Sequence, residues 1–166
     1  MTLKKQLIML RWAIFNTTLC ASFIYFFFDE LGDTVAYLGG FFFLLFLLPV
    51  IIIHYNYYQI SRNYIYEFTE NYIIITKGED ELTINIDEIE SVEFAMTANQ
   101  IKKSGLRKFP FEGYYYASIK LKSSPPVILT CLICPQLESV FLSSFPKIPV
   151  NVTHVFYPYI HKPRLS

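Results

Sequence analysis

Four basic side chains within seven residues form the most distinctive polar cluster of the sequence. They are Lys102, Lys103, Arg107 and Lys108. Within residues 97–113 the only acid is Glu112, so this stretch carries a strong local positive charge. Cations held near a membrane surface attract anionic headgroups, at about 1 kcal/mol each. The cluster therefore predicts contact with anionic lipid or a partner. The alternative is a solvated loop with the excess of Lys and Arg usual on the cytoplasmic side.

Cys131 and Cys134 have the Cys-x-x-Cys spacing of half a zinc site, and His154 and His161 follow them in the chain. No second cysteine pair exists, so a four-ligand site requires the tail to fold over the end of a sheet. A redox role of the thioredoxin type requires the pair to open a helix within a βαβ unit. Cysteines near the end of a buried strand are ordinary core residues. We therefore predict no metal site and no cofactor.

Six carboxylates of the chain cluster at turns and look like solubilising turn residues. They are Glu79, Asp80, Glu81, Asp87, Glu88 and Glu90. No nearby His or Ser suggests an acid–base partnership with them. A glycine-rich phosphate loop and a Gly-x-Ser-x-Gly elbow are also absent from the sequence. The formal net charge is +0, and no motif or basic face suits nucleic acid. We predict a chain that is neither an enzyme nor a nucleic-acid-binding protein.

Two long apolar runs, residues 7–28 and 35–58, are the elements that must hold the polar residues in position. Each has the roughly 20 residues that a helix needs to cross a hydrocarbon core of about 30 Å. The short acidic turn between them forces the two helices to return antiparallel. A buried helix pair of a soluble protein is the alternative, but apolar side chains all around both helices suit lipid better. The sequence predicts a transmembrane hairpin over residues 1–61.

The basic residues set the orientation of this hairpin. Lys4, Lys5 and Arg11 flank the first run and Arg62 follows the second, whereas the turn has neither Lys nor Arg. Basic residues concentrate on the cytoplasmic side of membrane proteins. We therefore expect a multi-pass protein of the inner (cytoplasmic) membrane with both termini in the cytoplasm. The first run is too long for a signal peptide and lacks a cleavage site of small residues.

The remaining 100 or so residues alternate between apolar and polar side chains, which is typical of strands. The expected strands cover residues 64–69, 72–76, 82–86, 89–94, 114–122 and 127–133. Pro135 suits the first turn of a following helix, and Pro146 ends it. We predict an α+β domain over residues 62–146, an antiparallel meander or barrel capped by one C-terminal helix. Residues 147–166 are expected to be an extended tail.

One part of this meander has a more specific pattern. A dense strand from Asn71 to Thr76 (NYIIIT) is followed by a Lys-Gly turn and a second strand, LTINI. Ile86, Ile89 and Val92 then fit an I-x-x-I-x-x-V segment. With the hairpin in front, the chain resembles bacterial pleckstrin-homology (PH)-like membrane proteins, over roughly residues 62–145. The resemblance implies a binding or assembly module with no shared enzymatic residues, and the tail departs from it.

Together these features predict a non-enzymatic, membrane-anchored module that presents a cytoplasmic surface to a protein partner. The exposed sheet edge, or a groove beside the C-terminal helix, is the expected partner surface. The alternative is a small accessory subunit of a membrane transporter or secretion complex, in which the transmembrane helices make the main contacts. Gly39, Gly40 and Pro49 would then be essential. A lipid-interface enzyme is the least favoured class, because no nucleophile and base pair is present.

Overall fold

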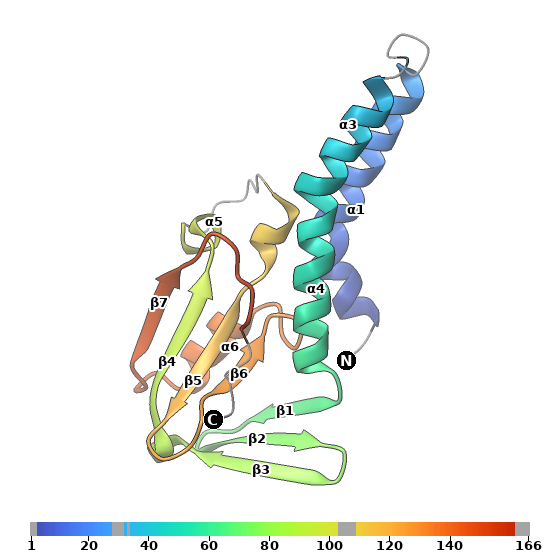
Figure 1. The fold of residues 1–166 in the computed structure, drawn as a ribbon. Helices are drawn as coiled ribbons and strands as arrows, with labels where there is room; N and C mark the ends of the chain where they lie inside the picture. The colour runs from blue at the N-terminus through green and yellow to red at the C-terminus, as the bar shows by residue number, and fades with distance from the viewer. Residues whose placement is uncertain (1–2, 28–31, 33, 103–108, 162–166) are drawn as a thin grey trace.

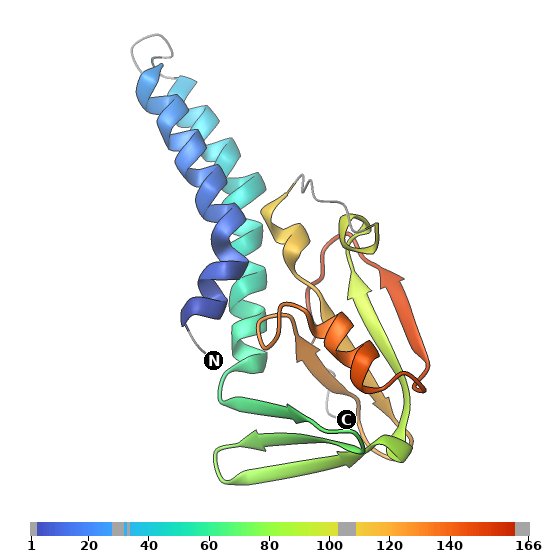
Figure 2. The ribbon, with the colours of Figure 1, turned by 180° about the vertical axis from the view of Figure 1, so that it is seen from behind.

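The computed structural model describes residues 3–27, 32, 34–102 and 109–161. Two long antiparallel helical segments form a rod, and a domain of two β-sheets lies beside one end of it (Figure 1). The view from behind shows the other end of the rod projecting well beyond the domain (Figure 2). The order of elements is therefore the predicted one, with helices first and strands after them.

The rod consists of α1 (Leu3–Phe26) and a second helical stretch in three parts. These are α3 (Thr34–Phe42), the π-helical turn η1 (Phe43–Leu47) and α4 (Leu48–Ser61). Pro49 lies just after η1. Because proline has no N–H to donate, the helix in front of it cannot keep a regular hydrogen-bond ladder. The irregularity expected at this proline is thus taken up by a π-helical turn.

Among the described residues, one helix is long and apolar enough to cross a membrane, Tyr37–Ser61. Ala13–Phe26 is a shorter apolar helix. The second span of the hairpin stays a prediction.

The first sheet has three antiparallel strands in the order β1-β2-β3. They are β1 (Tyr64–Phe68), β2 (Tyr72–Lys77) and β3 (Asp80–Asn85). Asn63 connects α4 to β1 with a φ of 68°, and Gly78 turns β2 into β3 with a φ of 63°. Asparagine and glycine tolerate this left-handed backbone better than other residues. The chain can therefore leave the rod and fold into a hairpin of strands within a few residues.

The second sheet has the order β6-β5-β4-β7. Its strands are β4 (Ile89–Met96), β5 (Tyr116–Leu121), β6 (Val127–Thr130) and β7 (Val150–His154). The helical pieces of this half are η2 (Ile86–Glu88), α5 (Ala98–Ile101), η3 (Pro110–Gly113) and α6 (Leu137–Ser144). Strand β7 pairs parallel with β4, from Val92 opposite Val150 to Met96 opposite His154.

This last strand corrects the predicted meander. The antiparallel pattern accounts for β1 to β6, but β7 is parallel, and α6 is followed by a strand rather than by a tail alone. Four of the five side chains of β7 are exposed. The strand is short and lies just after Pro149 in the stretch expected to be a tail, so the sequence analysis did not identify it as a strand.

The core of the domain continues into the rod. Phe141 of α6 packs edge-on against Phe94 of β4, with ring centroids 6.2 Å apart, and thereby covers one face of the second sheet. The same hydrophobic cluster includes Val50, Ile53 and Tyr57 of α4. Helix α4 is thus a wall of the domain, whereas no described residue of α3 belongs to this buried cluster.

Candidate functional site

One face of α4 forms a joint between the rod and the domain. The buried residues of this helix are Val50, Ile53, Tyr57 and Ser61, which recur every three or four positions. This spacing places them on one side of an α-helix. That side contacts β6 and η3. The joint therefore fixes the domain against the rod along about three helical turns.

Tyr57 lies at the centre of the joint and is 0% exposed. Its ring meets those of Tyr114 and Tyr116 edge-on, with centroid distances of 5.5 and 6.4 Å. Its hydroxyl donates a hydrogen bond to the carbonyl oxygen of Pro158, at 2.8 Å. The side chain thus combines aromatic packing with a satisfied polar end, as a buried tyrosine requires.

His54 extends the joint one turn toward η1. Its Nδ1 lies 2.9 Å from the hydroxyl oxygen of Tyr114. Burial raises the pKa of Tyr114, so its hydroxyl stays protonated and can donate to a neutral imidazole. The structure therefore places the imidazole of His54 against a phenol of the domain.

A second polar pair closes the lower end of the joint. The hydroxyls of Ser61 and Thr130 are hydrogen-bonded to each other, and both residues are buried. They join the last turn of α4 to the end of β6. Each buried hydroxyl is therefore satisfied by the other element, which ties the helix to the sheet.

Residues 156–160, which we call the C-terminal strap, cross α4. Tyr157 donates to the carbonyl oxygen of Pro49, at 2.9 Å. The amide side chain of Asn56 donates to the carbonyl oxygen of Ile160 at 3.1 Å and accepts from its N–H at 3.0 Å. The sequence analysis did not identify this contact. The signal for it was a group of hydrogen-bonding side chains in an otherwise apolar helix.

The α5 and η3 segments form one end of the domain, beside the rod, and we call it the α5–η3 end (Figure 1). Its polar groups are paired internally. Asn99 donates to a carboxylate oxygen of Glu112 at 2.7 Å, and the N–H of Phe109 donates to the same oxygen at 3.2 Å. Gln100 donates to the carbonyl oxygen of Gly113 at 2.9 Å. These contacts tie α5 to η3.

The predicted basic cluster lies next to this end. Lys102 caps α5 and is exposed. Lys103, Arg107 and Lys108 lie outside the described residues. Whether the four act together therefore stays a prediction.

The cysteine pair lies in the core region. Cys131 is buried, and the N–H of Tyr115 points at its sulfur, 3.5 Å away. Cys134 is half-buried, whereas His154 and His161 are exposed. Within the described ranges, no three His, Cys, Asp or Glu side chains are grouped closely enough to hold a metal ion. The arrangement is that of core cysteines.

A groove lies at the C-terminal end of α6, and we call it the η2–α6 groove. It has a volume of about 620 Å³. Its lining includes Glu70, Asp87 and Glu88 on one side and Phe145 and Lys147 on the other. Three carboxylates against one ammonium make it acidic. A groove beside the C-terminal helix was one of the two expected partner surfaces.

A smaller, mostly apolar groove of about 290 Å³ runs between the two sheets. Tyr64 and Tyr66 of β1 face Val127 and Ile128 of β6 across it. Burial raises the pKa of Tyr66, so its hydroxyl stays neutral. This groove has no charged residue in its lining, in contrast to the η2–α6 groove.

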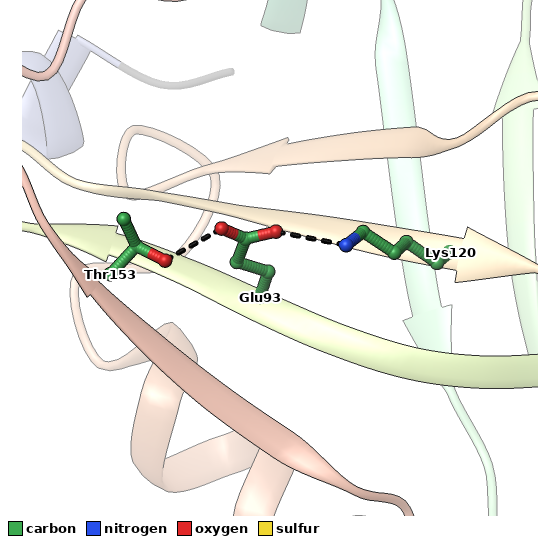
Figure 3. A network of polar contacts seen from close by, with 3 residues as sticks. All are labelled: Glu93, Lys120 and Thr153. Carbon is green, nitrogen blue, oxygen red and sulfur yellow. Dashed lines mark hydrogen bonds and ion pairs between the residues drawn. The ribbon is translucent and has the colours of Figure 1, made fainter.

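One half-buried carboxylate has defined partners. Glu93 of β4 accepts a hydrogen bond from Thr153 of β7 at 2.6 Å and an ion pair from Lys120 of β5 at 3.1 Å (Figure 3). The Thr153 hydrogen bond and then the Lys120 contact hold the pKa of Glu93 below its usual value. The group thus links three adjacent strands, and it explains how an edge strand without a buried face is held in register.

Comparison with protein families decides the class of this chain. The model of a family described as PH domain matches residues 1–139. This chain belongs to the PH domain family. No curated protein and no solved structure matches the chain. PH domains are in general non-catalytic binding modules, and this family supports the predicted PH-like α+β fold.

The match to the family model covers the rod and most of the domain but not the last strand and the strap. It includes α1, α3 and α4, so the rod belongs to the matched region. It ends within α6, so β7 and the C-terminal strap lie beyond it. The joint is therefore built from a matched helix and an unmatched strap.

Proposed function

We propose that this PH domain is a bacterial, non-enzymatic interaction module that its hairpin anchors in the cytoplasmic membrane, with both termini in the cytoplasm. The hairpin spans the bilayer twice, and the domain presents the η2–α6 groove to a protein partner. Anchoring confines the domain to the membrane surface and so raises its effective concentration for a membrane-bound partner.

One observation supports the anchoring above all. The half of the rod that projects beyond the domain, which we call its upper half, is surrounded by large apolar side chains that are exposed. They include Phe15, Leu19, Phe23 and Phe26 of α1, and Tyr37, Phe41 and Leu44 of the second helical stretch. Contiguous apolar surfaces of this kind are rare on soluble monomers and mark membrane or protein contacts. In lipid the same side chains are in a favourable environment.

The acidic lining of the η2–α6 groove sets the chemistry of the partner. Glu70, Asp87 and Glu88 favour a basic peptide segment, since charge complementarity steers binding and rejects acidic competitors. The basic cluster from Lys102 to Lys108 is proposed to face anionic lipid instead, which keeps the two charged regions from competing for one ligand.

An accessory subunit of a membrane transporter or secretion complex is the second candidate. Side chains added at Gly39 and Gly40 would meet nothing within 4 Å in this structure. These small residues therefore do not serve contact within the hairpin. Small residues let a further helix approach closely in a membrane.

Photo-crosslinking in native membranes tests the proposal. A crosslinking side chain is introduced at Asp87, in the groove, or at Glu79, an exposed acid in the β2–β3 turn outside it. We expect carbonate-resistant membrane association of the full chain and a discrete protein adduct from position 87 alone. A fluorescent protein fused to the C-terminus should remain fluorescent, as expected in the cytoplasm.

Three results would contradict the proposal. A chain recovered in the soluble fraction would remove the anchor. Equal adducts from positions 79 and 87 would remove the groove as the partner surface. Adducts from positions 39 and 40, with none from the groove, would favour the accessory subunit.

A further inference from the structure

The exposed apolar surface of the second helical stretch is longer on its outer face than on the face toward the domain. On the outer face it continues past η1 through Ile51 and Ile52 to Tyr55. From Tyr37 to Tyr55 this band covers about 18 helical steps, or roughly 27 Å at about 1.5 Å each. Its length matches a hydrocarbon core of about 30 Å.

The first helix carries an exposed apolar band of similar length. Exposed apolar side chains run from Leu7 to Phe26. This distance is about 19 helical steps, or roughly 29 Å. Arg11 lies within the band and is exposed, near the end at which its long side chain can reach the headgroups. Both helices therefore carry an apolar band of bilayer length.

On the face toward the domain, the part of the apolar band that is free of contact with the domain is much shorter. Coming from Tyr37, the helix meets an aromatic ring of the domain at Phe46, whose ring centroid lies 5.7 Å from that of Phe109. Only about 9 helical steps, or roughly 14 Å, separate Tyr37 from Phe46. The α5–η3 end thus overlaps the apolar band of the rod by roughly 14 Å.

From this overlap we propose that the α5–η3 end of the domain, with Phe156, is immersed in the interfacial layer of the same bilayer. The inference rests on the proposed anchoring. Interfacial helices penetrate about 5–10 Å into the boundary of headgroups and acyl chains. Tilt of the rod and local thinning of the bilayer accommodate the remainder.

The composition of this end fits that environment. Phe156 is 74% exposed and Ile101 is 42% exposed, although the domain has a core in which to bury them. Phe156 packs edge-on against Phe111, with centroids 6.0 Å apart, so it is held at the surface by a buried partner. Aromatic side chains concentrate at membrane interfaces.

The polar groups at this end fit as well. Glu112 is engaged by Asn99 and by the N–H of Phe109, and Thr97 donates to the carbonyl oxygen of Glu112 at 3.2 Å. Backbone and side-chain groups that enter a membrane must be satisfied internally. Lys102 is long enough to extend its ammonium toward the headgroups.

Quenching of tryptophan fluorescence by brominated lipids tests the immersion. The chain has one tryptophan, so Trp12→Phe supplies a dark background in the full-length protein. Into it we introduce Phe156→Trp or, as a second probe of the same end, Ile101→Trp. Leu82→Trp is the matched control, since Leu82 is 52% exposed but lies on β3 at the far end of the domain (Figure 1). Phe41→Trp reports on the anchor.

In phosphatidylglycerol–phosphatidylcholine vesicles, we expect shallow bromines to quench the probes at positions 156 and 101 and to shift their emission to the blue. Position 82 should be neither quenched nor shifted, and position 41 should respond most to deep bromines. Quenching at 41 without quenching at 156 and 101 would overturn the immersion and leave the anchor intact. No quenching at 41 would overturn both. Equal quenching at 82 would also overturn the immersion, because adsorption would not be specific to one end.

Discussion

The two halves of the second helical stretch, residues 34–47 and 48–61, form one continuous helical segment but have opposite surroundings. In the upper half, large side chains such as Tyr37 and Phe41 are exposed all around the helix. In the lower half, α4 buries one face against the domain. Hydropathy therefore identifies the helix as a whole but does not show where the domain begins to cover it.

The two halves differ in their polar side chains. His54, Asn56, Tyr57 and Ser61 lie in the lower half, and each makes a hydrogen bond to the domain or to the C-terminal strap. Residues 35–47 contain no charged residue and no amide side chain. A polar residue in an apolar helix is costly in lipid unless it is paired. Such residues therefore indicate a protein neighbour.

Replacement of one tyrosine in each half gives the largest expected difference in the free energy of unfolding of the domain. Tyr57→Ala should lower the free energy of unfolding of the domain by about 3–5 kcal/mol, because it leaves a large cavity in a packed core. Tyr37→Ala removes the same atoms from a side chain that is 79% exposed, and it should leave domain stability unchanged. Near-ultraviolet circular dichroism in detergent, followed through a denaturant titration, measures both.

One result for this pair of variants would contradict the proposed difference between the two halves of the helix. If both variants lost equal stability, the upper half would be packed against protein as well, and the rod would be a helix of an assembly rather than an anchor. Membrane association of Tyr37→Ala should match that of the unchanged chain.

The contrast between buried and exposed regions also explains which parts of the fold the sequence predicts. Strands β1 to β6 were all located from the sequence, by alternation as in β1 and β3 or by dense apolar runs as in β2, in which Ile73 and Ile75 are buried. Strand β7 is short, follows Pro149 in a stretch expected to be a tail, and has exposed side chains at three successive positions, residues 151–153. Its position depends on pairing with β4, which is a long-range contact that local periodicity does not encode.

The same reasoning applies to the candidate site. Asp87 and Glu88 were interpreted from the sequence as acidic turn residues without a catalytic role, and folding brings them to one groove with Glu70 and Lys147. The joint was not predicted, because Asn56 and Ile160 are more than a hundred residues apart in the chain. Only the excess of polar and aromatic residues at both places pointed to a contact.

Asn56 provides a second, smaller test of the division between the halves. Asn56→Leu removes both hydrogen bonds to the backbone of Ile160 and should destabilise the strap by about 1–3 kcal/mol, since a buried amide and carbonyl lose their partners. We expect faster proteolysis and faster hydrogen exchange at residues 156–160. Gln59→Leu is the control on the same helix, because Gln59 bonds only to the exposed Tyr55 among the interactions described here. Equal proteolysis of the two variants would show that the strap is held by other contacts.

The hydrogen bond between His54 and Tyr114 gives the smallest effect, and it adds a dependence on pH. Tyr114→Phe should cost about 1 kcal/mol near neutral pH, the usual net value of one hydrogen bond. Burial raises the pKa of Tyr114 above the ordinary 10.0, and burial likewise raises the pKa of Tyr115. Above about pH 10 the unfolded chain releases these protons while the folded chain retains them, so stability falls as the pH rises.

The variant should therefore lose less stability than the unchanged chain between about pH 9 and pH 11, because one of the tyrosines that favour the protonated, folded state is gone. Tyr115 remains, so the decline becomes shallower rather than disappearing. Denaturant midpoints measured across this range decide the point. Parallel curves for the two proteins would mean that Tyr114 already ionises at its ordinary pKa, in which case it is not shielded by α4 and the lower half of the helix is as open as the upper half.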